Sequence, residues 1–213
     1  MVLQVTQIVR GYSLKRVLLL AALLPAIALA IDCANPEEPA DRAICGHPEL
    51  RKQNDEIESL TAGLKAKAIV QDTVTPFLRQ RNNCSNETGD VAGCVQKVQS
   101  QRLAALRKGE EKELLGQAYF IDVPFLWKYW GDLEGRKLAV YGCLSLTDAT
   151  PRVHAELESE NQPVVQVLFK SMPEQTAEFL DDQRPCAHWV VTVRKEGGKL
   201  LLYADEVLGN RLP

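Results

Sequence analysis

Six cysteines constrain the fold of this 213-residue chain more than any other feature of its sequence. They are Cys33, Cys45, Cys84, Cys94, Cys143 and Cys186. An even number of cysteines in an exported chain is typical of disulfides. The first four lie within 62 residues and the other two follow much later, which predicts two bridges in one unit and one bridge in another. No CxxC motif occurs and the three histidines are scattered, so we expect no metal site.

The first 30 residues are typical of a secretory signal peptide. Three basic residues and no acid precede or begin an apolar run of about 14 residues, which ends in Ala28-Leu29-Ala30. This run is shorter than the roughly 20 residues that span a bilayer, so we expect no integral membrane span. Asp32 stands before Cys33, where a lipoprotein signal has a small residue. We therefore expect cleavage near Ala30 and a periplasmic or secreted protein without a lipid anchor.

The charge of the remaining chain limits its partners. Removing the three basic residues of the signal leaves 22 basic against 28 acidic residues, a net charge of about −6. Nucleic-acid binding requires a basic face, so we expect no nucleic-acid partner. With 46% hydrophobic and 25% charged residues, the chain has the composition of an ordinary globular protein.

Residues 31–110 are predicted to form a three-helix unit. After a short helical stretch before Cys45, apolar residues recur at helical spacing from Pro48 to Ile69. A second helix is expected over Thr73–Asn82, and a third from Val91 to about Lys108 with Val95, Val98, Leu103 and Leu106 buried. Short connections make such helices antiparallel neighbours, so the unit is expected to be a small bundle.

Residues 83–90 are predicted to be a polar loop between the second and third helices. In this arrangement Cys45, Cys84 and Cys94 lie at one end of the bundle, and three pairings of the first four cysteines remain open. We favour the interlaced set, Cys33–Cys84 with Cys45–Cys94. Because a loop held at both ends loses little entropy on binding, it is a candidate partner-binding tip. Its candidate residues are Ser85, Asn86, Glu87 and Asp90.

A connector at residues 111–134 is rich in aromatic side chains. Residues 119–130 hold six of the 13 aromatic residues of the chain. Trp127 and Trp130 are three apart and share a face if the stretch is helical, which makes them a candidate interface. The alternative, which we favour, is that the stretch packs the helices against the next unit.

Residues 135–209 show the pattern of a small β domain. Strands are expected over Lys137–Leu146, Arg152–Leu157, Val164–Phe169, His188–Arg194 and Leu200–Val207, with a short helix over Glu174–Asp181. Three strands, a helical insert and two strands is the order of an OB-fold barrel, and the domain is similar to small bacterial OB domains. The first and fourth strands of such a barrel are neighbours, so Cys143 and Cys186 could bridge. The alternative is two free buried thiols.

Several motifs of the helical unit resemble the lysozyme inhibitor LprI-type N-terminal domain family. They are Asp32-Cys33-Ala34, Asp41-Arg42-Ala43-Ile44-Cys45, Pro48-Glu49-Leu50, the run Phe77-Leu78-Arg79-Gln80-Arg81-Asn82-Asn83-Cys84, and Cys94 followed by Arg102-Leu103-Ala104-Ala105-Leu106. The resemblance covers about 75 residues, and Phe77 stands where the family has a tryptophan. It implies a helical, disulfide-tied domain and an exported bacterial protein that binds lysozyme and occludes it.

The chain as a whole is therefore predicted to be a two-domain α+β protein that binds a protein partner, and lysozyme is the expected one. Glu49, Asp55, Glu56 and Glu58 could present an acidic face to this basic enzyme, although interleaved bases favour an ordinary solvated face. The alternative is a scaffold module whose OB-like domain binds a protein or a glycan. No GxSxG, HExxH or phosphate loop occurs, so we expect neither catalysis nor a cofactor. The oligomeric state is left open.

Overall fold

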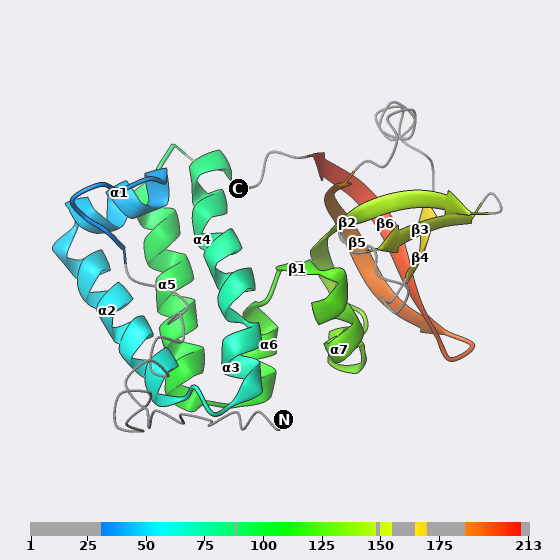
Figure 1. Ribbon diagram of the computed structural model, residues 1–213, viewed down its shortest axis with the longest axis horizontal. Coiled ribbons are helices and arrows are strands. Elements are labelled where there is room, and N and C mark those ends of the chain that lie inside the picture. The colour runs from blue at the N-terminus through cyan, green and yellow to red at the C-terminus, as the bar shows by residue number, and fades with distance from the viewer. Residues whose placement is uncertain (1–30, 88, 148–149, 155–164, 170–185, 210–213) are drawn as a thin grey trace, which may run out of the picture. The chain divides into compact units, whose positions relative to one another are not determined.

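The computed structural model describes residues 31–87, 89–147, 150–154, 165–169 and 186–209, which belong to one compact unit that begins at Ile31 (Figure 1). The predicted signal peptide and the predicted helix at 174–181 lie outside the described residues. The helices are α1 (Pro39–Gly46), α2 (Pro48–Gly63), α3 (Ala68–Asp72), α4 (Val74–Glu87), α5 (Val91–Lys108), α6 (Glu111–Gln117) and α7 (Val123–Leu133). The strands are β1 (Phe120–Asp122), β2 (Lys137–Thr147), β3 (Thr150–His154), β4 (Val165–Phe169), β5 (Cys186–Glu196) and β6 (Lys199–Gly209).

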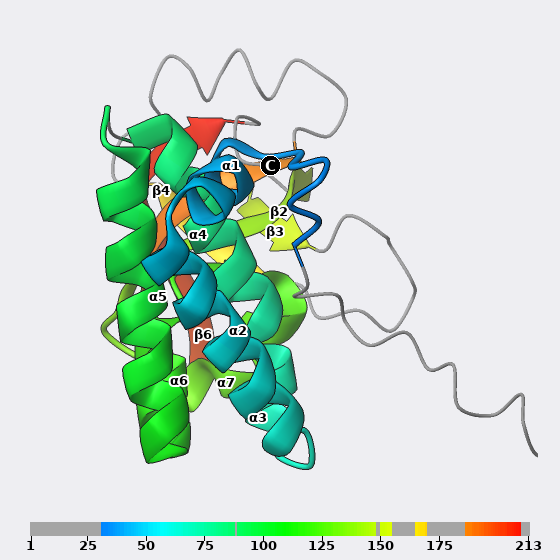
Figure 2. The same ribbon diagram turned by 90° about the vertical axis from the view of Figure 1, so that its left-hand side faces the viewer.

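The long helices α2, α4 and α5 pack side by side, with α5 against both of the others (Figures 1 and 2). Two local signals set the bounds of α5, which are the predicted ones. The Asp90 carboxylate caps its first turn, and Gly109 ends it in the left-handed conformation with φ 65°. All four residues that were expected to be buried on this helix are buried, so the bundle core forms as predicted.

The other two predicted helices differ from the expectation at their ends. The first begins at Pro48 as predicted but stops at Gly63, and Ile69 belongs to the separate helix α3. The second continues to Glu87 rather than stopping at Asn82, because the polar residues after position 82 extend α4 by more than one turn. Most of the predicted polar loop is therefore helical.

The favoured pairing of the first four cysteines is wrong. The structure joins Cys33 to Cys45 and Cys84 to Cys94, at sequence separations of 12 and 10. The continuation of α4 explains the second bridge, because Cys84 lies in its last turns and Cys94 in the first turn of α5. The leading segment folds back onto the end of α1, which places Cys33 beside Cys45. Each bridge therefore closes a short local loop.

The aromatic connector contains one element that the sequence did not predict. Phe120–Asp122 forms β1, which pairs in parallel with β2, and Asp122 then caps α7 by accepting a hydrogen bond of 2.9 Å from the Phe125 backbone N–H. Phe120, Phe125 and Tyr129 are buried, which agrees with the favoured packing interpretation. The stretch therefore contributes core to both the helices and the sheet.

The β region is a six-stranded mixed sheet, so the predicted α+β class is confirmed. β2 pairs antiparallel with β3 and with β5, β3 with β4, and β5 with β6, whereas β4 and β6 are parallel. The pairings thus lead from β2 through β3, β4, β6 and β5 back to β2. Gly197 and Gly198, at φ 56° and 80°, form the predicted tight turn between β5 and β6. The predicted bridge Cys143–Cys186 is confirmed and joins facing positions of β2 and β5.

Arg136, just before β2, fastens the sheet to the helices. Its guanidinium donates hydrogen bonds to the carbonyls of Leu115, Gly116 and Ala118 at 2.5 to 3.0 Å. These carbonyls lie at the end of α6, where the helix leaves acceptors without internal partners. Within the described ranges, no helix has both the length and the apolarity needed to cross a membrane.

Candidate functional site

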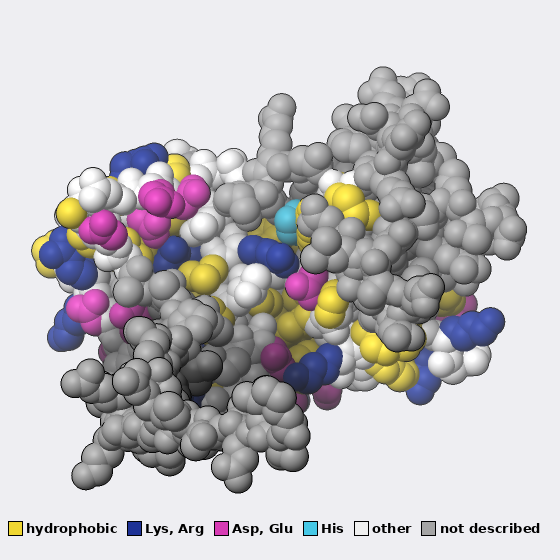
Figure 3. All heavy atoms as spheres, in the orientation of Figure 1, with side chains coloured by type: hydrophobic (Ala, Val, Ile, Leu, Met, Phe, Trp, Pro, Cys, Tyr) yellow, Lys and Arg dark blue, Asp and Glu magenta, His cyan; other side chains and the backbone are white. Residues whose placement is uncertain are grey.

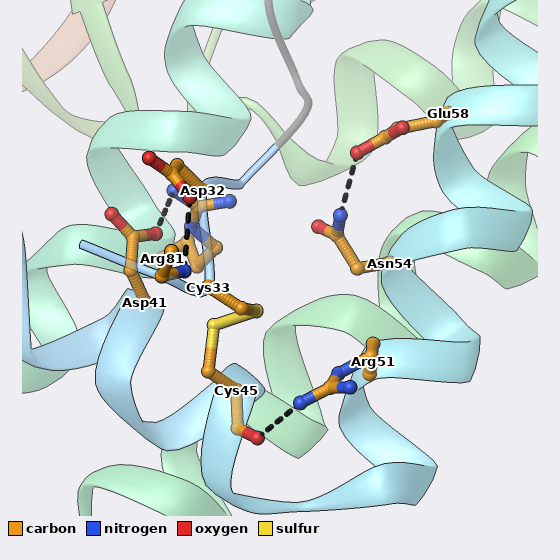
Figure 4. The surroundings of a disulfide bond; sticks show 9 residues. Asp32, Cys33, Asp41, Cys45, Arg51, Asn54, Glu58 and Arg81 are labelled. Atoms are coloured by element: carbon orange, nitrogen blue, oxygen red, sulfur yellow. Dashed lines mark hydrogen bonds and ion pairs between the residues drawn. A yellow bond between two sulfur atoms is a disulfide. The ribbon is translucent and has the colours of Figure 1, made fainter. Parts of the chain in front are cut away.

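A buried arginine surrounded by carboxylates marks the end of the helical bundle near the Cys33–Cys45 bridge (Figure 4). Arg81 lies on α4 and is 5% exposed. Its guanidinium donates to the Asp41 carboxylate on α1 at 2.9 Å, and its Nε donates to Asn82 at 3.3 Å. The ion pair joins two helices that are 40 residues apart in the sequence.

Two further carboxylates act on the same guanidinium. Burial lowers the pKa of Arg81, whereas the negative charges of Asp41, Glu38 and Glu58 act in the opposite direction. Three acids thus surround one cation, and we call these four residues the Arg81 cluster. Because the carboxylates outnumber the guanidinium, the cluster carries net negative charge.

Glu58 is the most restrained of these acids. Its carboxylate accepts a hydrogen bond of 2.7 Å from the buried amide of Asn54, as Figure 4 shows. Burial raises the pKa of Glu58, and the neighbouring Asp55 adds to this effect. Glu58 therefore faces the interior of the bundle rather than open solvent.

The first part of the described chain extends this negative charge. Residues 31–60 contain eight acidic and only three basic residues. Exposed Asp32 folds into a turn in which its carboxylate accepts from the Ala34 backbone N–H at 2.9 Å, and this bond lowers its pKa. Acidic side chains gather over the α1 region in Figure 3. The segment is therefore an acidic surface fixed by a disulfide and a buried ion pair.

The acidic face predicted on the first long helix does not assemble as one surface. Glu56 pairs with Arg107 of α5 at 2.6 Å, and Glu49 lies 3.4 Å from the imidazole of His47. Glu58 belongs to the Arg81 cluster, which leaves Asp55 exposed on the helix. The four acids therefore point to different neighbours.

The candidate binding tip has a different structure from the predicted one. Ser85, Asn86 and Glu87 lie in the last turns of α4, and the Asp90 carboxylate accepts from the Gly93 N–H at 2.9 Å as the cap of α5. The Glu87 side chain lies outside the described atoms. Partner binding by these residues stays a prediction, but Asp90 has a structural role of its own.

The two candidate interface tryptophans have different surroundings. Trp127 is 51% exposed on α7. Trp130 is half-buried, and the Lys195 ammonium lies 4.8 Å from the centroid of its ring. A cation over the ring occupies the face that a partner would use, so Trp127 is the more available of the two.

Metal and thiol chemistry have no site in the part of the chain that is described. No three His, Cys, Asp or Glu residues converge there in a way that could hold a metal ion. All six cysteines are in disulfides. Sequence reasoning missed the Arg81 cluster, although the spacing of Arg81 three residues before Cys84 indicated a residue on the bridged side of the helix.

Comparisons of the chain with protein-family models, with curated proteins and with solved structures find no match in any of the three. Its function must therefore be argued from the residues themselves.

Proposed function

We propose that the protein is an exported, non-catalytic binding protein whose acidic segment, residues 31–60, binds a basic protein. The observation that carries the proposal is the Arg81 cluster, in which three carboxylates surround one buried guanidinium. Lysozyme is the partner to test first, because it is basic and because the cysteine motifs resemble those of LprI-type inhibitors. Binding would inhibit the enzyme by covering its cleft.

Two physical properties of the segment support this proposal. Opposite charge steers association and gives specificity more than affinity, and the segment contains eight acids against three bases. The Cys33–Cys45 bridge and the Asp41–Arg81 pair hold the segment in place before it meets a partner, so little entropy is lost on binding. Three disulfides also fit an oxidising compartment outside the cytosol.

A turbidity assay with bacterial cells and lysozyme tests the proposal. We expect the purified protein to slow lysis at several-fold molar excess over the enzyme. The double variant Glu37→Lys/Asp55→Lys, which reverses two exposed acids of the segment, should inhibit much less. The matched control Glu110→Lys/Glu111→Lys makes the same charge change at α6 and should inhibit as the unchanged protein does.

Two outcomes of this assay decide against parts of the proposal. No inhibition by the unchanged protein would exclude lysozyme, and a pull-down from host secretions and envelope extract would then search for another basic partner. Equal loss in both double variants would show that overall charge, rather than the acidic segment, carries binding. Glu87→Lys tests the end of α4 separately, because it leaves the Asp90 cap intact.

The sheet supports a second candidate function. We infer an OB-like barrel from the strand order, because the pairings return from β5 to β2 and because β4 and β6 are parallel. Domains of this kind bind sugars or proteins over their second and third strands, which are β3 and β4 here. Titration with soluble peptidoglycan fragments tests the glycan form of this candidate. Saturable heat of binding supports it, and no heat at high fragment concentration excludes it.

A further inference from the structure

A second buried arginine lacks the carboxylates that surround Arg81. Arg102 lies on α5 and is 2% exposed. Its Nη1 donates to the Thr73 hydroxyl at 2.8 Å and its Nη2 donates to the Val70 carbonyl at 3.2 Å, whereas Nε has no hydrogen-bond partner. Burial lowers its pKa to about 10, so it remains charged at neutral pH.

The groups around Arg102 compensate only part of its charge. The Thr73 hydroxyl donates its own hydrogen to the Ile69 carbonyl and serves Arg102 only as an acceptor. The face of Phe77 lies 5.5 Å from the guanidinium carbon and adds a cation–π contact. Neutral oxygens and a ring stabilise a cation much less than an anion does, and a buried charge without a counterion is costly.

A small cavity adjoins this guanidinium. It lies between α4, α5 and α6 and has a volume of about 10 Å³, which is room for about one water-sized particle. Phe77 and Leu114 form apolar walls, and the amide-bearing side chains of Gln80, Gln101 and Gln117 also line it. A cation at the wall with amide groups nearby offers donors to a negative ligand and no carboxylate to repel it.

We propose that the Arg102 cavity binds one small monovalent inorganic anion of the halide class. The size of the cavity excludes phosphate, sulfate and organic carboxylates, which need several atoms' space. A water molecule would fit but would leave the charge of Arg102 uncompensated. The anion would supply the missing counterion and accept the hydrogen bond of Nε, and so would stabilise the packing of α5 against α4 and α6.

Thermal unfolding in different sodium salts tests this inference. At equal ionic strength, we expect the unfolding temperature to rise saturably with chloride or bromide and not with gluconate, which is too large for the cavity. Ligand binding to the folded state alone produces such a shift. Equal curves in chloride and gluconate would overturn the proposal, because screening by salt does not depend on the size of the anion.

Variants on the same helix localise the effect. Arg102→Met should abolish the difference between chloride and gluconate, whereas Arg107→Met, at an exposed arginine of α5, should retain it. If Arg102→Met does not fold, crystals of the unchanged protein grown or soaked in bromide give an independent answer. An anomalous bromide peak beside Arg102 supports the site, and a water there without a peak excludes it.

Discussion

Asp41 of α1 and Arg81 of α4 form an ion pair of 2.9 Å in which the two side chains are only 15% and 6% exposed. This pair and the neighbouring Cys33–Cys45 bridge hold the first described residues against the bundle. The acidic segment is therefore part of the folded core at its base and a solvent-facing surface elsewhere. Its proposed binding role depends on this attachment.

Removing one partner of this pair should destabilise the protein strongly. Asp41→Asn leaves the Arg81 guanidinium buried without its closest counterion, and breaking a buried pair in this way costs about 3 kcal/mol. Urea unfolding followed by circular dichroism measures the loss. The control Asp55→Asn removes an exposed acid and should change stability by less than about 0.5 kcal/mol. A similar small change in both variants would show that Glu38 and Glu58 replace Asp41.

The three disulfides should differ in their contributions to stability. Loop-closure entropy predicts about 3 kcal/mol for Cys33–Cys45 and for Cys84–Cys94, and about 4 kcal/mol for Cys143–Cys186, which closes the longest loop. Paired Cys→Ser variants and chemical unfolding test this order. Peptide mapping without reduction should recover these three pairs, and recovery of Cys33–Cys84 would contradict the structure.

Local sequence signals predicted the elements whose ends depend on neighbouring residues. Asp90 and Gly109 set the bounds of α5, and the two glycines 197–198 set the turn between β5 and β6. The strand order also placed Cys143 opposite Cys186, because the pattern of three strands, an insert and two strands fixes which strands are neighbours. These features require little knowledge of distant parts of the chain.

Features that depend on distant contacts were not predictable in the same way. The pairing of the first four cysteines depends on whether α4 ends at Asn82 or Glu87, which the polar residues after position 82 do not reveal. β1 is three residues long and is a strand only because β2 lies beside it. A buried arginine has the sequence appearance of an exposed one, so neither Arg81 nor Arg102 was identified.

Tyr129 of α7 should ionise only in strongly alkaline solution. Burial and a hydrogen bond of 2.5 Å to the Asp72 carboxylate raise its pKa to about 12. Because the unfolded chain ionises near 10, the folded state loses stability as the pH rises from 10 towards 12. Tyr129→Phe should remove this alkaline step, measured by unfolding at several pH values. At neutral pH it loses a charge-assisted hydrogen bond, about 2 kcal/mol.

The exposed Tyr203 provides the control for Tyr129. Its hydroxyl donates to Glu196 at 2.6 Å on the surface of the sheet. Tyr203→Phe should change neutral-pH stability by less than about 0.5 kcal/mol. If both variants lost equal stability, the buried position of Tyr129 would have no special effect.

His188 should make the protein sensitive to mild acid. Its imidazole is 4% exposed on β5 and packs edge-on against Phe120, with ring centroids 5.8 Å apart. Burial, followed by the positive charge of Arg79, lowers its pKa to about 4. The unfolded chain takes up this proton near pH 6.5, so stability should fall as the pH decreases from 6.5 towards 4. His188→Gln should flatten this part of the urea-unfolding profile. His47→Gln, at an exposed histidine, should leave it unchanged, and an unchanged profile in His188→Gln would refute the assignment.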